Sequence, residues 1–305
     1  MLRQLKNAAR AIAPMPIRHA WGSLYGQAKI RRARRAFDGG DDLGGARVLS
    51  IDALPDLMRR GYQPPGVICY DADGLVERAR EKIGQLAARV PLETCRSSVE
   101  LGCWDGMVLA ALRERLPLAA AFGADRSTAG IDPRALAAGV RFVQTDASQL
   151  ALASGSIDLI YSFAAFEHFA DPRGVMQESW RVLRPGGHLF LLFGPVYTSP
   201  YGLHAYRQIP VPYCQYLFAE ADLRSYAQRE GLPAAWPYVN GVSVTDYRRL
   251  WSDERARFEQ LYYHEHPSGG VGAELIAEYP GCFRAKVPAF DDLLVSAIEI
   301  GLRKR

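Results

Sequence analysis

The sequence lacks the features that mark several protein classes. Its cysteines number five among 305 residues, an odd and widely spread set without a Cys-x-x-Cys pair. This pattern fits neither a disulfide framework nor a thiolate zinc site, and it indicates a reducing compartment, so we expect a cytoplasmic protein. No apolar run approaches the roughly 20 residues that a membrane-spanning helix needs, and the sequence therefore predicts no integral membrane protein.

Acidic residues are missing from residues 1–37, which carry nine lysines and arginines. The formal net charge of the chain is +4, and it becomes −5 once these nine are set aside, so the basicity belongs to one arm. Leu2, Leu5, Ala9 and Ile12 recur at helical spacing, which predicts an amphipathic arm that lies on an anionic membrane surface, at the inner face of the membrane. A transit peptide and a solvated tail are the alternatives.

The hydrophobic share of 49% and the charged share of 23% are typical of a folded protein, and the length predicts one elaborated domain or two unequal ones. We expect a basic amphipathic arm at 1–37, a linker and helical segment at 38–96, a ligand-binding core at 97–194, a substrate lid at 195–245, and a C-terminal helix with closing strands at 246–305.

Short apolar runs alternate with amphipathic stretches from residue 97 onward. Strands that alternate with helices predict a parallel sheet with right-handed crossovers. We therefore expect an α/β fold with a Rossmann-like doubly wound sheet, mostly parallel and closed by an antiparallel strand. The strands are expected at 98–102, 118–124, 140–144, 157–162, 188–193, 258–263 and 294–302, and the helices at 71–90, 107–116, 172–183 and 245–251.

Acidic residues stand where three successive predicted strands end, at Glu100, Asp125 and Asp146. Ligands of a doubly wound sheet bind beyond the carboxyl ends of its strands. The first turn contains only Gly102 and Gly106, which argues against a dinucleotide, whose pyrophosphate needs several exposed backbone N–H groups. A carboxylate beside this turn suits a cation, and the other two acids suit a ribose and an adenine amino group. These acids predict a positively charged nucleoside, and S-adenosyl-L-methionine is the common cofactor that fits.

Residues 97–194 resemble the class I S-adenosylmethionine-dependent methyltransferases. The resemblance rests on five motifs in the family's order, ELGCWDG at 100–106, GAD at 123–125, TDA at 145–147, IDLIYS at 157–162 and LRPGG at 183–187. It implies that the first motif lines the methionine moiety, that Asp125 binds the ribose, and that Asp146 and Ala147 contact the adenine. The cofactor contacts that it implies are Glu100, Gly102, Cys103, Gly106, Asp125, Arg126, Asp146, Ala147, Ser162 and Phe163.

Two positions complicate this resemblance. Trp104 stands where the family often has a glycine, which affects the tightness of the turn. Asp132 competes with Asp125 for the ribose role, and we favour Asp125 because Asp132 leaves too few residues for a helix before the strand at 140. Helix capping is the structural alternative for Asp125 and Asp146, and Asp158 reads as a structural acid.

Two histidines follow predicted strands and are the candidate catalytic groups. Methyl transfer asks the protein chiefly for alignment, but a hydroxyl acceptor benefits from a general base, for which histidine is suited near neutral pH. His204 and His168 are both candidates, with loop packing and a structural role beside the cofactor as their alternatives. His188 reads as structural. The acids form no cluster at metal-site spacing, so we expect transfer without a metal.

The segment after the fifth strand is rich in tyrosine, and Tyr197, Tyr201 and Tyr206 are predicted to bind the acceptor. Flat rings with hydroxyls suit sugars, although they also suit the segment's own core. The segment resembles its counterpart in bacterial surface-glycan methyltransferases. We therefore expect O-methylation of a sugar hydroxyl on a glycan or lipid-linked saccharide. A small-molecule natural-product methyltransferase is the alternative. A nucleic-acid partner is disfavoured by the acidic body, and a non-catalytic scaffold by the three acids.

Overall fold

The computed structural model describes residues 15–39, 47–64, 66 and 71–305, with side chains from residue 26. Its centre is a seven-stranded sheet in the order β3-β2-β1-β4-β5-β7-β6. β7 runs antiparallel to both of its neighbours, β5 and β6. This confirms the predicted Rossmann-like α/β fold with an antiparallel closing strand. The strands are β1 Ser97–Leu101, β2 Ala120–Asp125, β3 Arg141–Gln144, β4 Ile157–Phe163, β5 Leu183–Phe193, β6 Phe258–Pro267 and β7 Val295–Lys304.

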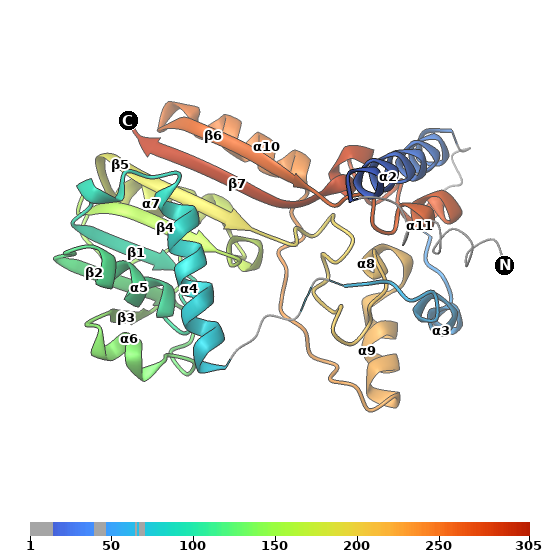
Figure 1. Ribbon diagram of the computed structural model, residues 1–305, viewed down its shortest axis with the longest axis horizontal. Helices are drawn as coiled ribbons and strands as arrows, with labels where there is room; N and C mark the ends of the chain where they lie inside the picture. Colours follow the sequence, from blue (N-terminus) through green and yellow to red (C-terminus); the bar gives the residue numbers. More distant parts are fainter. Residues whose placement is uncertain (1–14, 40–46, 65, 67–70) are drawn as a thin grey trace.

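Helices cover both faces of the sheet (Figure 1). One face packs against α4 and α5 and the other against α7 and α10, as the two hydrophobic clusters show. The expected α10 begins one residue early, because Ser243 rather than Thr245 caps it by accepting a hydrogen bond from the amide of Asp246. The helices are α4 Ala72–Ala87, α5 Met107–Arg115, α6 Pro133–Ala137, α7 Pro172–Val182 and α10 Val244–Asp253.

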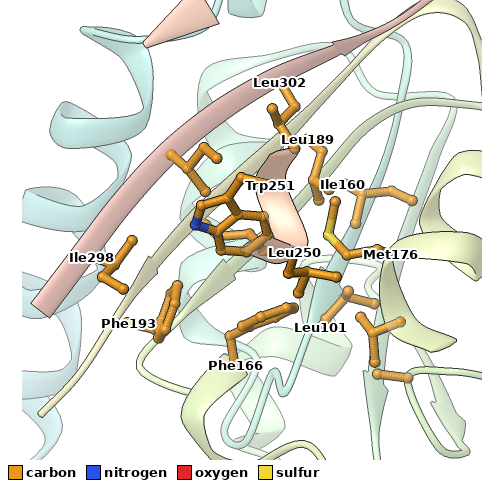
Figure 2. Close-up of a cluster of buried hydrophobic side chains, with 14 of the residues drawn as sticks. Leu101, Ile160, Phe166, Met176, Leu189, Phe193, Leu250, Trp251, Ile298 and Leu302 are labelled. Atoms are coloured by element: carbon orange, nitrogen blue, oxygen red, sulfur yellow. The ribbon is translucent and has the colours of Figure 1, made fainter. Parts of the chain in front are cut away.

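Hydrophobic side chains alternate between the two faces. Along β5, Leu189 and Leu191 belong to the cluster with α7 and α10, whereas Phe190 belongs to the other, as the two-residue period of a strand requires. Figure 2 shows the first cluster, with the ring of Trp251 from α10 in the middle of side chains from the strands and α7. Each fully buried side chain of this size contributes about 1.5–3 kcal/mol, so the cluster fixes α10 on the sheet.

A second hydrophobic core lies beyond one end of β7, beside the sheet (Figure 1). Segments from distant parts of the chain build it, and the buried Tyr213 ties two of them by donating a hydrogen bond of 2.8 Å to the carbonyl of Leu293. Most of the predicted lid at 195–245 therefore belongs to a packed core with the N-terminal helices. The helices of this region are α2 Met15–Asp38, α3 Leu54–Met58, α8 Cys214–Leu217, α9 Glu220–Arg229 and α11 Ala273–Glu278.

The described part of the basic arm belongs to this second core. Residues 15–38 form α2, in which Ala33 is buried and Lys29 forms an ion pair of 3.1 Å with Glu274 of α11. The rings of Phe37 and Phe290 lie 5.6 Å apart. Residues 26–37 of the predicted arm therefore have a packing partner within the protein itself. Residues 1–14, with the predicted amphipathic repeat, lie outside the described residues. Among the described helices, none is both long enough and apolar enough to cross a membrane.

Candidate active site

Two adjoining cavities lie at the carboxyl ends of the strands around β1, where the strand order reverses. This is the edge at which doubly wound sheets bind ligands. The smaller cavity has a volume of about 300 Å³ and the larger about 850 Å³. The residues that line both are Gly102, Trp104, Ala164, His168 and Pro237.

The glycine turn between β1 and α5 forms the wall that the cavities share. Gly102 and Gly106 have φ angles of 69° and 74°, in the left-handed region that favours glycine. A Cβ on Gly102 would collide with the side chain of Ala165. Trp104, the predicted departure from the family, also has a positive φ of 45°, and its ring is exposed on both cavities. The tight turn therefore forms despite the missing glycine, with strain at Trp104.

The first predicted acid, Glu100, lies in the floor of the larger cavity and is only 3% exposed. Burial raises the pKa of its carboxyl to about 8, against the nearby positive charge of Lys82, which lowers it. Burial in turn lowers the pKa of Lys82 from its ordinary value. The hydroxyl of Tyr161 lies 3.5 Å from Glu100. A buried acid of this kind gains from a cationic ligand.

The second and third acids line the smaller cavity. Asp125 accepts hydrogen bonds from the amides of Trp104 at 3.0 Å and Ser127 at 3.1 Å. Asp146 accepts from the amide and hydroxyl of Ser148, at 2.9 and 2.7 Å, and these bonds hold the pKa of its carboxyl below the ordinary value. Arg126 and Ala147 line the same cavity. Both acids thus stabilise turns while remaining at the cavity wall.

Asp132, the alternative candidate for the ribose, and Asp158 both have structural hydrogen-bond partners. Asp132 caps α6, a helix of five residues, and its bonds to Arg134 lower the pKa of Asp132 to about 2. A helix does fit there, so the reason given for preferring Asp125 was wrong, although Asp125 is the one at the cavity. Asp158 accepts hydrogen bonds of 2.8 Å from the amides of Arg96 and Ser97, as its structural interpretation predicts.

The remaining predicted cofactor contacts divide into two groups. Cys103 and Phe163 line the larger cavity. Gly106 and Ser162 line neither cavity. Gly106 is the N-cap residue of α5, and the buried Ser162 donates a hydrogen bond of 2.9 Å from its hydroxyl to the carbonyl of Leu101. These two therefore support the turn from behind the wall.

The two candidate histidines lie together, with ring centroids 4.9 Å apart. His168 lines both cavities, and burial lowers its pKa. Burial lowers the pKa of His204 further, to about 4. Glu167 completes the group, since one donor atom from each of the three lies within 4.8 Å of the others. Sequence reasoning considered only clusters of acids and missed this mixed cluster, because folding brings His204 to a sequence-adjacent Glu-His pair.

The predicted acceptor tyrosines do not line either cavity. The ring of Tyr197 packs 5.9 Å from that of Tyr216 in the second core. Tyr201 is buried, and its hydroxyl donates 3.1 Å to the carbonyl of Gln63. The ring of Tyr206 lies 6.3 Å from that of His204. The structural alternative, packing within the segment, describes Tyr197, whereas Tyr201 also contacts a residue outside the segment.

Sequence reasoning missed two parts of the wall. Tyr238 covers the smaller cavity and is 58% exposed. Helix α4 contributes Arg78 and Lys82 to the larger cavity. The sequence did contain a signal for this role of α4. Residues four apart share a helix face, and Arg78 and Lys82 are two cations on one face beside an apolar stripe. Arg78 forms an ion pair with the buried Asp105 of the glycine turn and lies over the ring of Trp104.

Comparisons with known proteins show what the chain is similar to. The methyltransferase domain family matches residues 99–191. The chain is 34% identical to a trans-aconitate 2-methyltransferase of Azoarcus sp. (strain BH72), over 68% of this chain and 87% of that protein. It is 37% identical to a trans-aconitate 2-methyltransferase of Deinococcus radiodurans, over 34% of this chain and 40% of that protein. A solved geranyl diphosphate methyltransferase in complex with SAM has 16% identity and a TM-score of 0.49, covering 86% of this chain and 97% of that one.

Proposed function

This chain belongs to the class I S-adenosylmethionine-dependent methyltransferases, and from that premise we propose that it methylates a small carboxylic acid on a carboxylate oxygen. Two relatives that bear the name trans-aconitate 2-methyltransferase support this choice, one of them over most of its length. The cavity that carries the proposal is the larger one, which is lined by Arg78 and Lys82 of α4 and also by His168.

The residues of the two cavities fit S-adenosylmethionine. Asp125 and Asp146 offer acceptor oxygens for hydroxyl and amino groups in the smaller cavity, and Gly102 leaves room where a Cβ would collide. Glu100 is a buried carboxyl for which a cationic amine is a favourable neighbour. The cofactor, when bound, supplies a methyl group on a positively charged sulfur. The protein then has to align the acceptor and exclude water.

Lys82 is the residue to which we assign the acceptor carboxylate. Its ammonium lies 5.0 Å from the centroid of the Phe163 ring, at the cavity wall, and burial disfavours its charge unless an anion is near. Arg78 is engaged by Asp105 and is held between that acid and Trp104. Lys82 is thus the more adaptable of the two cations, as a point charge with rotatable donors.

A carboxylate acceptor also agrees with the state of the two histidines. A carboxylic acid is already ionised at neutral pH, so its oxygen needs no general base. Burial lowers the pKa of both His168 and His204, so each is a weaker proton acceptor than an ordinary histidine. The general-base role of either histidine remains a prediction for a hydroxyl acceptor.

The sugar hydroxyl is the second candidate acceptor. It rested on Tyr197, Tyr201 and Tyr206, none of which lines the two cavities. A pair of relatives named for a tricarboxylic acid favours the carboxylate instead.

A transfer assay on the purified full chain tests the choice. Methyl-labelled S-adenosylmethionine is offered with trans-aconitate, related di- and tricarboxylates, and free saccharides. We expect label in a carboxylic acid, released by mild alkali, because methyl esters hydrolyse under conditions that leave methyl ethers intact. Label that appears only in a saccharide, as an alkali-stable ether, overturns the proposal.

A Lys82→Met variant tests the acceptor contact. We expect the KM for the acid to rise at least tenfold while the Kd of S-adenosylhomocysteine changes less than threefold. Lys29→Met, which removes one positive charge from α2, is the matched control and should change neither value. An equal rise in both values would assign Lys82 to the cofactor's own carboxylate and not to the acceptor.

A further inference from the structure

We propose that Glu167, His168 and His204 form a binding site for one divalent transition-metal ion at the wall of the two cavities. Glu167 and His168 belong to the short turn Phe166–His168 after β4, and His204 belongs to the loop after β5. Parallel neighbouring strands place both loops at the same edge of the sheet. The cluster adjoins both cavities through His168, which lines each of them.

The separations are close to those of a metal site. One donor atom from each residue lies within 4.8 Å of the others, and Nε2 of His168 lies 3.9 Å from Oε1 of Glu167. Two donors on one tetrahedral zinc ion lie about 3.3 Å apart, given bonds of roughly 2.0 Å. The donors therefore need to approach one another by about 0.6 to 1.5 Å, which side-chain rotation can supply.

The hydrogen bonds that both histidines donate to backbone carbonyls leave the other nitrogen of each ring available for a metal. Nδ1 of His168 lies 2.5 Å from the carbonyl of Tyr238, and Nε2 of His204 lies 2.8 Å from the carbonyl of Pro195. A carbonyl only accepts, so each of these nitrogens carries the proton and the other nitrogen of each ring keeps its lone pair. Metal-binding histidines are held in the same way, by a carbonyl on the nitrogen that faces away from the ion.

The carboxyl group of Glu167 is buried and only partly hydrogen-bonded. Oε1 accepts a hydrogen bond of 3.1 Å from the amide of Gly194. Oε2 is buried and has no hydrogen-bond partner among the described residues, while the side chain as a whole is 1% exposed. A buried carboxylate oxygen without a partner is costly, and a bound cation would remove that cost.

The donors select the class of ion. Two imidazoles with one carboxylate suit zinc, iron, cobalt or manganese, and they resemble the His-His-Glu set of catalytic zinc sites. Magnesium and calcium prefer oxygen ligands. Three protein ligands leave at least one position of the ion open to a further ligand.

That open position suggests a role that rests on the proposed function. A second carboxylate of a di- or tricarboxylic acceptor would bind the ion at that position, beside the two cavities that His168 lines, while the carboxylate paired with Lys82 is the one that reacts. The ion binding itself does not depend on the identity of the acceptor, so the two proposals can fail separately.

Cobalt titration of the chelator-treated full chain tests the site directly. Co²⁺ bound to two imidazoles and a carboxylate in a four- or five-coordinate site gives visible absorption bands that aqueous Co²⁺ lacks. We expect these bands to saturate at one equivalent and to disappear when Zn²⁺ is added. A chain that develops no such bands at millimolar Co²⁺ overturns the proposal, whatever its methyltransferase activity.

Variants locate the ion. Glu167→Gln and His204→Ala should each weaken Co²⁺ binding at least tenfold, with folding checked by circular dichroism and by binding of S-adenosylhomocysteine. The matched control is the double variant His264→Ala, His266→Ala. These rings lie 4.5 Å apart on β6 beside Glu299, so they offer the same types of metal donor at a different place. Loss of the bands only in the β6 variant would place the ion there and overturn the assignment.

Discussion

A carboxylate oxygen of Asp125, at the end of β2, accepts a hydrogen bond of 3.0 Å from the backbone amide of Trp104 in the glycine turn. The same carboxylate accepts from the amide of Ser127 through its other oxygen. Asp125 therefore holds the left-handed turn in place while it lines the smaller cavity. One side chain therefore supports the turn and, as we propose, also contacts the cofactor.

This dual role predicts different results for two substitutions. Asp125→Ala removes both hydrogen bonds and the charge, so we expect the Kd of S-adenosylhomocysteine to rise about 10- to 100-fold, as a charged hydrogen bond is worth about 1.5–3 kcal/mol. Asp125→Asn keeps one acceptor oxygen and should have a smaller effect. Calorimetric titration measures both, and Asp132→Ala is the control because Asp132 caps α6. An unchanged Kd in Asp125→Ala contradicts the cofactor assignment.

Gly102 offers a second test of the cavity wall. In Gly102→Ala, a Cβ at a φ of 69° would collide with Ala165, so we expect a loss of about 1–3 kcal/mol in stability and no measurable cofactor binding. Gly155→Ala is the matched control, with a φ of 66° and nothing within 4 Å. It should cost about 1 kcal/mol and leave the Kd unchanged. Equal effects of the two variants, measured by denaturant unfolding and calorimetry, would show that the collision is unimportant.

The pKa of Glu100 predicts how stability depends on pH. The folded carboxyl keeps its proton up to about pH 8, whereas the unfolded chain loses it above its ordinary value of 4.5. The unfolded state thus binds fewer protons between these values, and this group destabilises the fold as pH rises through that window. We expect the free energy of unfolding of the chain without cofactor to fall less steeply in Glu100→Gln than in the wild type. Parallel curves from pH 5 to 8, with chelator present, contradict this.

The sequence predicted the sheet because its signals are local. The alternation of apolar runs and helical stretches located β1 to β5, and the acids at strand ends predicted where Asp125 and Asp146 would lie. The positive φ at Trp104 was not expected, because a local motif does not show how Asp125 and Arg78 hold the turn from two other elements.

The second core was beyond local reasoning. Its members are far apart in the chain, as the ion pair of Lys29 with Glu274 shows, and no periodicity connects α2 with α11. The tyrosines of the segment after β5 look the same in sequence whether they face a ligand or a core. His204 likewise joins His168 only through the packing of two loops.

Asn240 holds the segment that covers the smaller cavity. Its side-chain amide donates hydrogen bonds of 3.2 Å to the carbonyls of Phe166 and Phe169. Its backbone amide donates a hydrogen bond of 2.9 Å to the carbonyl of Glu167. Tyr238, two residues earlier, lines the cavity. Asn240→Asp keeps the acceptor oxygen and loses the donated side-chain bonds, which leaves the carbonyl of Phe169 without this donor and costs about 1–3 kcal/mol.

We therefore expect Asn240→Asp to lower the unfolding temperature and to release the cofactor product at least fivefold faster, because Tyr238 loses its support. Tyr238→Ala is the comparison variant: it should speed product release to a similar extent but leave stability nearly unchanged, since the ring is mostly exposed. Stopped-flow dissociation and thermal unfolding measure the two effects. If Asn240→Asp lowers stability while the dissociation rate stays at the wild-type value, the segment at 237–240 does not retain the cofactor. Tyr238 then lines the cavity without slowing product release.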